Sequence, residues 1–569
     1  MRSYRLTLAC MLLLLVAATA LTVSTYSTFD QTYDEPAHIA AGIQLLDTGR
    51  YDYDLWHGPL ARLAVAVGPY LDGSRWHGEP NLFDEGRAIL YCCGKYETYE
   101  RTLTLARIGN LPFLIVLIVV TWLWGARVAG NATGLLAALF IATTPPILGN
   151  AAIATTDLAA AAMAALALYA LVRWVERPTV GASWFLGAAC ALGVASKLSA
   201  VPFLVVAAAG LGSSVLILQP RAVKQSVVQP RWQGYAIVLL AGLLTLWLAY
   251  DLRLAPVAQL DPRIDPLVDK MSGHPGMLRD AARFAVDAIP VPIYLVKLPL
   301  GVRWASGMAD RGHLTYLLGQ TSMRGWWYYY PINLAVRTPI PLLLMGLAGL
   351  GLLSVRGLRS RQWQILFPAV TFVSILAFCV LFVRFNLGLR HVLVLFPPLA
   401  IGAGYAIVRL FSASRGRIAA QGLAAGVVCW QAVTPILVMP DQMTYFNAFA
   451  GSKPEKILIV ADLDWGQDLK RLKAVLRERG IQKVHLAFQG SNDLTREQGL
   501  PSVERLPEDV PVDGWVAISV SRKARERQGY AWLERYQPVQ RVGRSIDLYY
   551  ICGVRRSAPA LAGEDIEAQ

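Results

Sequence analysis

Charged side chains are scarce in this sequence of 569 residues. Asp, Glu, Lys and Arg together make up 16% of the chain, whereas hydrophobic residues make up 55% and the mean hydropathy is +0.42. So low a charge content excludes an intrinsically disordered chain and is atypical of a soluble protein of this length. The composition therefore predicts a polytopic α-helical membrane protein.

Several other signals are missing as well. There is no H-E-x-x-H pattern and no Gly-rich phosphate-binding loop, which disfavours ATP or a sugar nucleotide as substrate. No internal repeat supports a transporter built from inverted halves. Four of the seven cysteines lie in apolar segments, and only Cys92, Cys93 and Cys552 lie in polar ones. A single disulfide among these three stays open, and a disulfide framework is excluded.

Basic residues outnumber acidic ones, with 53 Lys and Arg against 39 Asp and Glu and a net charge of +14. Most of them stand in short stretches between apolar runs, where they set membrane topology. Membrane lipids are therefore expected as partners, and nucleic acid is not.

Eleven apolar runs are candidates for helices that cross a bilayer, which takes about 20 residues each. They are 6–24, 109–124, 132–149, 158–173, 182–196, 199–217, 235–250, 336–354, 364–383, 391–408 and 418–438. The first run follows Arg2 and Arg5 as in a signal peptide, but it is too long for the apolar part of a typical one. We interpret it as an uncleaved anchor.

The basic residues predict the orientation of these spans. With the N-terminus in the cytoplasm, every short inner loop is basic, as the positive-inside rule requires. These loops carry Arg127, Arg173, Arg177, Arg221, Lys224, Arg231, Arg356, Arg359, Arg361, Arg409, Arg415 and Arg417. Segments 25–107 and 251–335 and all residues from 440 onward then lie outside. We expect a multi-pass protein of the inner (cytoplasmic) membrane with an extracytoplasmic C-terminal domain.

The chain after the last span is predicted to form a small soluble α/β domain. Its expected strands are 457–460, 484–488, 515–520 and 548–551, and its expected amphipathic helix is 467–479. The chain is thus divided into a transmembrane domain, 1–439, and a C-terminal domain, 440–569. We interpret the second as a packing lid or acceptor-docking module without catalytic groups.

Two adjacent carboxylates, Asp34 and Glu35, follow the first span in the stretch 30–38 (DQTYDEPAH). Because Pro36 follows them, they suit the first turn of a helix and could simply complement its N-terminus. Alternatively, one of them is a general base acting on a hydroxyl at the membrane surface. Glu35 and His38 share a helix face, so with Asp34 they could also hold a divalent cation.

Further charged residues are expected on the same side of the membrane. Arg62 follows His57 in the first outer segment and suits either lipid headgroups or a phosphate. Asp157 begins the fourth span, where a helix cap is the alternative to a functional role. Lys197 stands in an outer turn, and Arg384 and Arg390 flank another short outer segment. Cations between helices at one leaflet suit an anionic lipid headgroup.

Together these residues resemble the GT-C glycosyltransferases, in the branch of the protein O-mannosyltransferases and the aminoarabinose lipid A transferases. The resemblance rests on Asp34-Glu35, the H-x-P-L-x-R element at 57–62, Thr-Asp at 156–157, Lys197, and R-x5-R-H at 384–391. The tail adds Y-F-N at 445–447 and L-D-W-G-Q-D-L at 463–469, which are similar to a segment of bacterial members. Each motif is short, but the motifs follow one another in the family's order over nearly the whole chain.

The resemblance implies a role for each residue. Asp34 matches the catalytic acidic residue that deprotonates or orients the acceptor, and Glu35 is its partner. Arg62 matches a residue associated with the donor phosphate, and Lys197, Arg384 and Arg390 would help hold that phosphate. Asp157, His38 and His57 are expected to support the site. Two departures stand out: Gly58 replaces a common Pro, and 461–464 (ADLD) lacks a common Ser-Asn.

The family transfers a sugar from a polyprenyl phosphate to an acceptor outside the cytoplasm, with inversion at the anomeric carbon. The resemblance therefore implies such a donor and a protein, lipid or glycan acceptor. Modification of lipid A or another envelope glycolipid is the alternative, and a polyprenyl-lipid transporter is disfavoured because the mid-span positions are apolar. No cofactor is expected to be required, and a divalent cation stays open.

Overall fold

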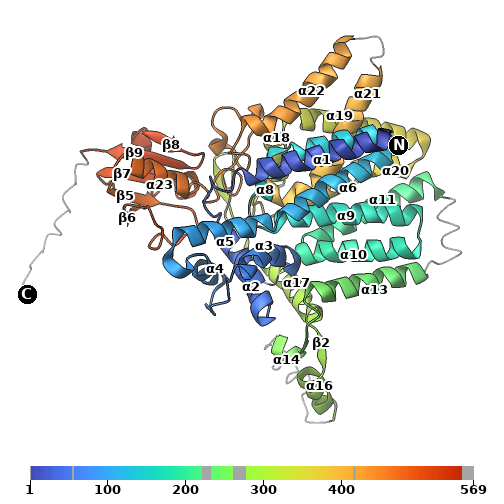
Figure 1. Ribbon diagram of the computed structural model, residues 1–569, viewed down its shortest axis with the longest axis horizontal. Helices are drawn as coiled ribbons and strands as arrows, with labels where there is room; N and C mark the ends of the chain where they lie inside the picture. Colours follow the sequence, from blue (N-terminus) through green and yellow to red (C-terminus); the bar gives the residue numbers. More distant parts are fainter. Residues whose placement is uncertain are drawn as a thin grey trace, which may run out of the picture.

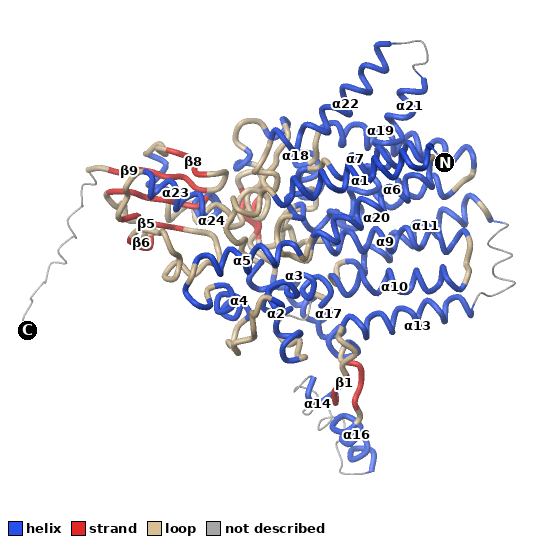
Figure 2. Tube along the Cα trace, in the orientation of Figure 1, coloured by secondary structure: helices blue, strands red, loops and turns tan. Residues whose placement is uncertain are grey.

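Long helices form one bundle in the computed structural model, and a smaller part with strands stands at one end of it (Figures 1 and 2). The structure describes residues 2–53, 55, 57–220, 232–260, 277–413 and 418–553. The bundle helices are α1 (Arg2–Val23), α6 (Leu111–Ala129), α7 (Asn131–Ala142), α8 (Pro145–Ala151), α9 (Asp157–Glu176), α10 (Val180–Ser196), α11 (Ala200–Leu218), α13 (Trp232–Ala249), α19 (Ile340–Ser360), α20 (Trp363–Phe382), α21 (Phe396–Ala413) and α22 (Ile418–Leu437). This is the predicted class, a polytopic α-helical membrane protein with a C-terminal α/β part.

The number of full-length spans is lower than the eleven predicted. Within the described ranges nine helices are long and apolar enough to cross a membrane, and α7 and α8, bent by 62° at their break, give a tenth if taken as one span. The remaining run is α10, which has only 17 residues. At a rise of about 1.5 Å per residue it is about 26 Å long, short of a hydrocarbon core of about 30 Å.

Small residues let the bundle helices approach closely. A Cβ atom on Gly349 of α19 would lie 1.8 Å from the carbonyl oxygen of Gly402 in α21, and one on Gly187 of α10 would lie 2.2 Å from that of Val238 in α13. Such contacts replace the hydrophobic driving force that is lost in lipid. They exclude larger side chains at both glycines.

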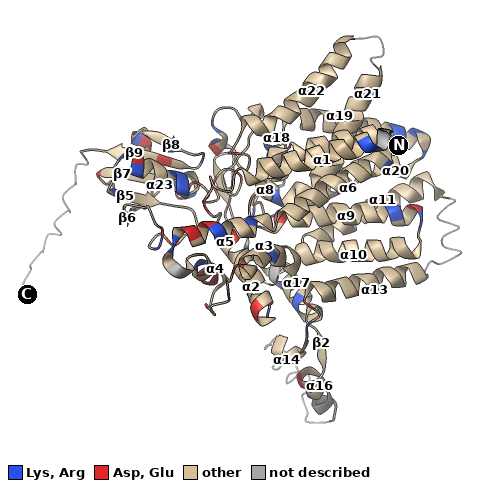
Figure 3. Ribbon diagram, in the orientation of Figure 1, with Lys and Arg blue, Asp and Glu red and all other residues tan. Residues whose placement is uncertain are grey.

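The N-terminus and the strand-containing part lie at opposite ends of the bundle (Figure 1). Arg127, Arg173 and Arg359 fall in the last turns of α6, α9 and α19. Lys and Arg are conspicuous at the N-terminal end, whereas both signs of charge mix at the other (Figure 3). The predicted inner-loop residues Arg221, Lys224, Arg231, Arg415 and Arg417 lie outside the described residues.

Segment 25–107 folds into short helices that pack on the end of the bundle opposite to the N-terminus. They are α2 (Glu35–Thr48), α3 (Pro59–Leu71), α4 (Leu82–Leu90), η1 (Cys92–Gly94) and α5 (Tyr96–Ile108). Ile39, Val65 and Leu103 form part of their shared core. Pro36 suits the first turn of α2, and Gly49, with a φ of 69°, ends it. This packing fixes the start of α2, and with it Asp34.

The second outer segment carries short strands and helices. They are β1 (Leu254–Pro256), α14 (Val257–Leu260), α16 (Met277–Ala288), β2 (Pro290–Pro292), α17 (Tyr294–Arg311), β3 (Thr315–Leu317), β4 (Gln320–Ser322) and α18 (Tyr329–Arg337). A one-to-two-turn helix, η2 (Leu389–Leu395), leads into α21. The residue before η2, Gly388, lies close to α18, because its N–H donates to the Tyr329 hydroxyl over 2.8 Å.

The C-terminal part contains a five-stranded sheet with the order β6-β5-β7-β9-β8. Its elements are α23 (Leu469–Glu478), β5 (Lys483–Ala487), β6 (Ser502–Arg505), β7 (Gly514–Ser519), α24 (Val520–Arg525), η5 (Ala531–Arg535), β8 (Gln540–Val542) and β9 (Ile546–Ile551). β5 runs parallel to β6 and β7, while β9 is antiparallel to β7 and β8. Cys552, just after β9, is a free thiol.

One predicted strand of this part is wrong. Residues 457–460 form no strand, because Ile457 N and Leu458 N donate back to the carbonyl oxygen of Pro454 in a turn, η4 (Pro454–Lys456). Their apolar side chains are buried in a loop instead, with Leu458 0% and Ile459 1% exposed. Two strands of the sheet, β6 and β8, were not predicted. Both are short and lie at the edges of the sheet.

The C-terminal part is joined to the first outer segment by backbone hydrogen bonds. Asp30 N donates to the carbonyl oxygen of Gln467 over 3.0 Å, and Tyr33 N donates to that of Trp465 over 2.9 Å. The L-D-W-G-Q-D-L motif thus lies directly against the chain that leads to Asp34.

Candidate active site

Four of the predicted residues meet in one chain of ion pairs. Lys197 Nζ lies 2.6 Å from Asp157 Oδ1, and Arg390 Nη1 lies 3.5 Å from Asp157 Oδ2. Arg390 Nη1 also lies 2.6 Å from Asp34 Oδ2. The four residues come from the start of α9, the turn between α10 and α11, η2, and the start of α2. Each stands at or next to the end or the start of a helix, so helix packing brings them to one level of the bundle.

Asp157 is the buried centre of this network. Its side chain is 1% exposed, and Oδ2 has no hydrogen-bond partner in the described part of the chain. The residue before it, Thr156, is at the cap position of α9 and makes no side-chain cap. A buried carboxylate needs opposite charge, and Lys197 and Arg390 supply it. Asp157 therefore orders two cations rather than capping its helix.

Asp34 is the more accessible carboxylate, with a side chain 25% exposed. It occupies the cap position of α2 but makes no side-chain cap hydrogen bond. The carboxylate points to Arg390 instead. The structure thus shows an ion pair of Asp34 with Arg390 in place of a side-chain helix cap.

Glu35 departs from its expected place beside Asp34 in the site. It is fully buried and forms a two-pronged ion pair with Arg107, with Nε–Oε1 and Nη2–Oε2 distances of 2.8 and 2.9 Å. Its oxygens also accept from Thr32 N over 2.7 Å and from Ala154 N over 2.8 Å. Every acceptor direction faces a donor, so Glu35 joins α2 and α5 to the loop before α9 as a structural ion pair.

Arg62, His38 and His57 form a second polar cluster. Arg62 is 0% exposed; its Nη1 donates to the Tyr51 hydroxyl over 2.9 Å, and its Nε donates to His38 Nδ1 over 3.3 Å. Arg62 Nη2 lies 3.3 Å from His57 Nδ1. Arg62 was expected to contact a donor phosphate. Its guanidinium is instead buried between α2 and α3. Its visible task is to hold these helices and the loop at 57–58.

Gly58 connects that cluster to the Lys197 turn. A Cβ atom at Gly58 would lie 2.1 Å from the carbonyl oxygen of Ala195, two residues before Lys197. This close approach accounts for glycine at this position.

We expect Gly58→Ala to displace the Lys197 turn, because a main-chain oxygen cannot yield to a methyl group. The melting temperature of the purified protein should fall by an amount equivalent to about 1–3 kcal/mol. Gly212→Ala in α11 is the matched control, since a Cβ there meets nothing within 4 Å. Equal melting temperatures for both variants would contradict the contact.

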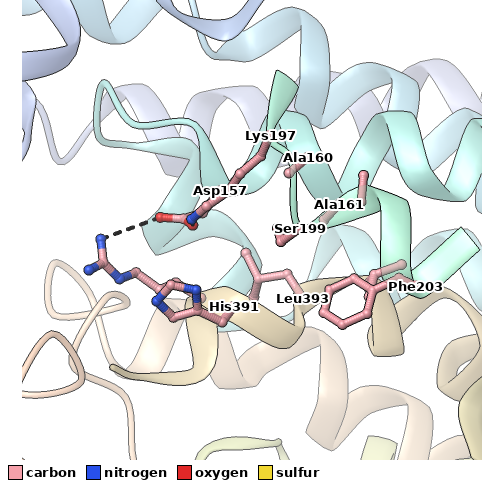
Figure 4. A pocket seen from close by; sticks show the side chains of 11 residues that line it. Asp157, Ala160, Ala161, Lys197, Ser199, Phe203, His391 and Leu393 are labelled. Atoms are coloured by element: carbon pink, nitrogen blue, oxygen red, sulfur yellow. Dashed lines mark hydrogen bonds and ion pairs between the residues drawn. The ribbon is translucent and has the colours of Figure 1, made fainter. Parts of the chain in front are cut away.

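A small pocket lies beside the ion pairs (Figure 4). Asp157, Lys197, Arg390 and His391 line its polar end. Its apolar walls come from α9, α11 and the chain around η2. They are Ala160, Ala161, Ala200, Phe203, Leu393 and Val394. The pocket thus places two cations and a histidine next to an apolar wall.

Two residues around the pocket were missed or misplaced by the sequence reasoning. His391 faces the ion pairs in Figure 4, and its Nε2 is buried without a hydrogen-bond partner in the described residues. Its only sequence signal was its place after Arg390. Arg384, predicted beside Arg390, is exposed, and the described residues include no hydrogen bond or ion pair of its guanidinium.

His313 of the second outer segment stands near this site. Its ring centroid lies 5.5 Å from that of Phe385, whose ring in turn lies 5.6 Å from that of His391. Burial lowers the pKa of His313 below its ordinary value, and the positive charges of Arg525 and Arg390 act in the same direction.

The proposed metal ligands do not converge. Asp34 faces Arg390, Glu35 faces Arg107, and His38 faces Arg62. Within the described ranges, no group of three or more His, Cys, Asp or Glu side chains has metal-binding geometry.

Comparison with known families addresses the resemblance seen in the sequence. Residues 101–248 match the sequence profile of the dolichyl-phosphate-mannose-protein mannosyltransferases. The chain resembles the GT-C glycosyltransferases. The matched region of this GT-C-like chain includes Arg107, Asp157 and Lys197 but neither Asp34 nor Arg390. No curated protein sequence matches the chain.

Two solved structures align with a large part of the chain at low identity. ArnT from Cupriavidus metallidurans, bound to undecaprenyl phosphate, has 12% identity and a TM-score of 0.47 over 94% of this chain and 97% of its own. The archaeal oligosaccharyltransferase AglB from Archaeoglobus fulgidus, in complex with an inhibitory peptide and a dolichol-phosphate, has 12% identity and a TM-score of 0.43 over 77% of this chain. The chain spans 55% of the length of AglB.

Proposed function

We propose that the protein transfers a sugar from a polyprenyl-phosphate-linked donor to an acceptor on the outer face of the inner membrane, with inversion. The observation that carries this proposal is the position of Asp34. Asp34 pairs with Arg390, which together with Lys197 lines the polar end of a pocket with apolar walls. The family match over residues 101–248 supports the same reaction class.

Each charged residue then has a task in the reaction. The acceptor oxygen forms a bond to the anomeric carbon, and the bond from that carbon to the phosphate oxygen breaks. Asp34 takes the proton of the acceptor hydroxyl as general base. The electron pair leaves with the phosphate, whose growing negative charge Lys197 and Arg390 stabilise. Asp157 keeps both cations in place. Attack opposite the leaving group inverts the anomeric carbon.

The proposed function requires the site to face the outer side of the membrane. If the end of the bundle that holds the N-terminus faces the cytoplasm, Asp34, Lys197 and Arg390 face outward together with the C-terminal part. The apolar pocket walls then lie at the depth of the lipid chains, where the polyprenyl tail of the donor would bind. Water is scarce there, which favours transfer over hydrolysis.

The acceptor decides between two forms of this function. A protein hydroxyl acceptor would make the protein an O-mannosyltransferase-like enzyme, whereas a lipid A or other glycolipid acceptor would make it an envelope-modifying enzyme. The family match to protein mannosyltransferases favours the first.

A reconstitution experiment tests the function. Purified protein in liposomes would receive mannosyl polyprenyl phosphate together with a serine- and threonine-rich peptide or with lipid A, in parallel reactions. We expect a new glycosidic bond in one product, detected by mass spectrometry. Movement of labelled lipid between leaflets with no glycosidic bond formed would support a transporter and overturn the proposal. Mass spectrometry of envelope lipids and secreted proteins, with and without the protein, would identify the natural acceptor.

A further inference from the structure

The C-terminal part contributes a side chain to the ion-pair network. The indole ring of Trp465 covers Arg390, with the guanidinium carbon 4.2 Å from the ring centroid. Trp465 is 6% exposed, so this contact is shielded from water. A cation over an aromatic face is attracted by the negative charge of that face, most strongly when the pair is desolvated. One face of the Arg390 guanidinium is therefore occupied by the tail.

The backbone of Trp465 holds the chain next to Asp34, the ion-pair partner of Arg390. Its carbonyl oxygen accepts from Tyr33 N over 2.9 Å, one residue before Asp34. Its own N–H donates to Gln467 Oε1 over 2.8 Å, which keeps the turn closed. A single tail residue thus holds the chain beside Asp34 with its backbone and Arg390 with its side chain.

Asp462, three residues earlier, fixes the start of the helix that carries Arg390. Its Oδ1 accepts from Leu389 N over 3.0 Å, and its Oδ2 accepts from Asn333 Nδ2 over 2.7 Å. Its charge is balanced by the buried guanidinium of Arg337, whose Nε lies 3.5 Å from Asp462 Oδ1. Arg337 Nη1 also donates to the Asp462 carbonyl oxygen over 2.6 Å. The start of η2 is thereby tied to the same tail segment.

We propose that Trp465 is a positioning residue that keeps Arg390 directed at the donor phosphate. The C-terminal part is then a component of the transferase site, in contrast to the lid or docking module expected from sequence. The inference rests on the proposed function for the identity of the ligand. The inference predicts that the affinity of Arg390 for a phosphate depends on the aromatic face of Trp465.

Substitution of Trp465 separates this role from simple packing. Trp465→Leu removes the aromatic face, and Trp465→Phe keeps it. The control is Trp532→Leu, which removes another buried tryptophan of the C-terminal part, one that packs on Tyr536 with ring centroids 6.3 Å apart. The probes are undecaprenyl phosphate and undecaprenol, which differ only in the phosphate. Melting temperatures of all variants report folding.

We expect Trp465→Leu to weaken binding of undecaprenyl phosphate about threefold to thirtyfold and to leave binding of undecaprenol unchanged. The affinity of Trp465→Phe for undecaprenyl phosphate should be within about threefold of that of the unchanged protein. The affinity of Trp532→Leu should equal that of the unchanged protein. The KM for the donor should follow the same order. Two results would overturn the proposal: equal phosphate affinity in Trp465→Leu and Trp532→Leu, or equal losses in Trp465→Leu and Trp465→Phe.

The same measurements tell this proposal apart from the proposed function. If the unchanged protein transfers no sugar but Trp465→Leu still loses phosphate affinity selectively, the transferase assignment fails and the positioning role stands. If transfer depends on Asp34 while Trp465→Leu retains full phosphate affinity, the transferase assignment stands and the positioning role fails.

Discussion

Asp34→Asn is expected to lower the rate of sugar transfer by about 10²- to 10⁴-fold, the usual contribution of a general base. The amide keeps the shape of the side chain but cannot accept the acceptor proton. Because the Asp34 side chain is 25% exposed and caps no helix, folding should be nearly unaffected. The measurement is the initial rate of transfer from a polyprenyl-phosphate-linked sugar in liposomes.

Binding measurements sharpen this test. The loss of one negative charge beside Arg390 should leave the affinity for undecaprenyl phosphate unchanged or raise it, since the carboxylate competes with the phosphate for the guanidinium. Asp72→Asn is the matched control, because Asp72 lies in the same outer segment, has a side chain 23% exposed and also pairs with an arginine, Arg101. A transfer rate for Asp34→Asn close to that of Asp72→Asn would remove Asp34 from the catalytic machinery.

Most of the helical framework could be predicted from the sequence, because hydropathy alone marks an apolar run. Each of the eleven runs coincides with a helix or with the bent pair α7 and α8. The run at 182–196 matches α10, Val180–Ser196, closely, so its short length was visible in the sequence although it was counted as a span. The apolar run at 457–460 misled for a different reason: burial in a turn produces the same composition as burial in a strand.

The candidate site was only partly visible in the sequence. Asp157, Lys197 and Arg390 stood out because a charge at the end of an apolar run is costly without a partner. The pairing between them depends on helix packing over long sequence separations, which no local pattern encodes. Arg384 and Arg390 look alike in sequence, but only Arg390 is turned inward, at η2. Trp465 stood out only as part of the L-D-W-G-Q-D-L motif, and no sequence pattern placed it against Arg390.

Asp34 and Glu35 show the same limit at neighbouring positions. Successive residues at the start of a helix point about 100° apart, so one carboxylate faces Arg390 while the other enters the core. Which one does so depends on Arg107, seventy-two positions away in the chain. Arg107 itself could have been suspected from its place just before an apolar run with no acidic residue near it.

Glu35→Gln is expected to destabilise the protein by about 3–5 kcal/mol, because it leaves the Arg107 guanidinium buried without its counter-charge. Both side chains are almost completely inaccessible, at 0% and 1%. Thermal unfolding in detergent would measure the loss. The double variant Glu35→Gln/Arg107→Met removes both charges, so its loss of stability should be smaller than the sum of the two single losses. Additive losses would show that the two charges are not coupled.

Transfer activity decides whether Glu35 has a catalytic role in addition. If its carboxylate serves only the Arg107 pair and Ala154 N, the folded fraction of Glu35→Gln should retain transfer within about tenfold, far above Asp34→Asn. Some loss is expected, because the Ala154 contact lies three residues before Asp157 and helps to place it. A Glu35→Gln protein that melts like the unchanged one but has lost transfer would instead make Glu35 the catalytic partner that the sequence suggested. Stability and rate thus respond in opposite order to substitutions at two adjacent carboxylates.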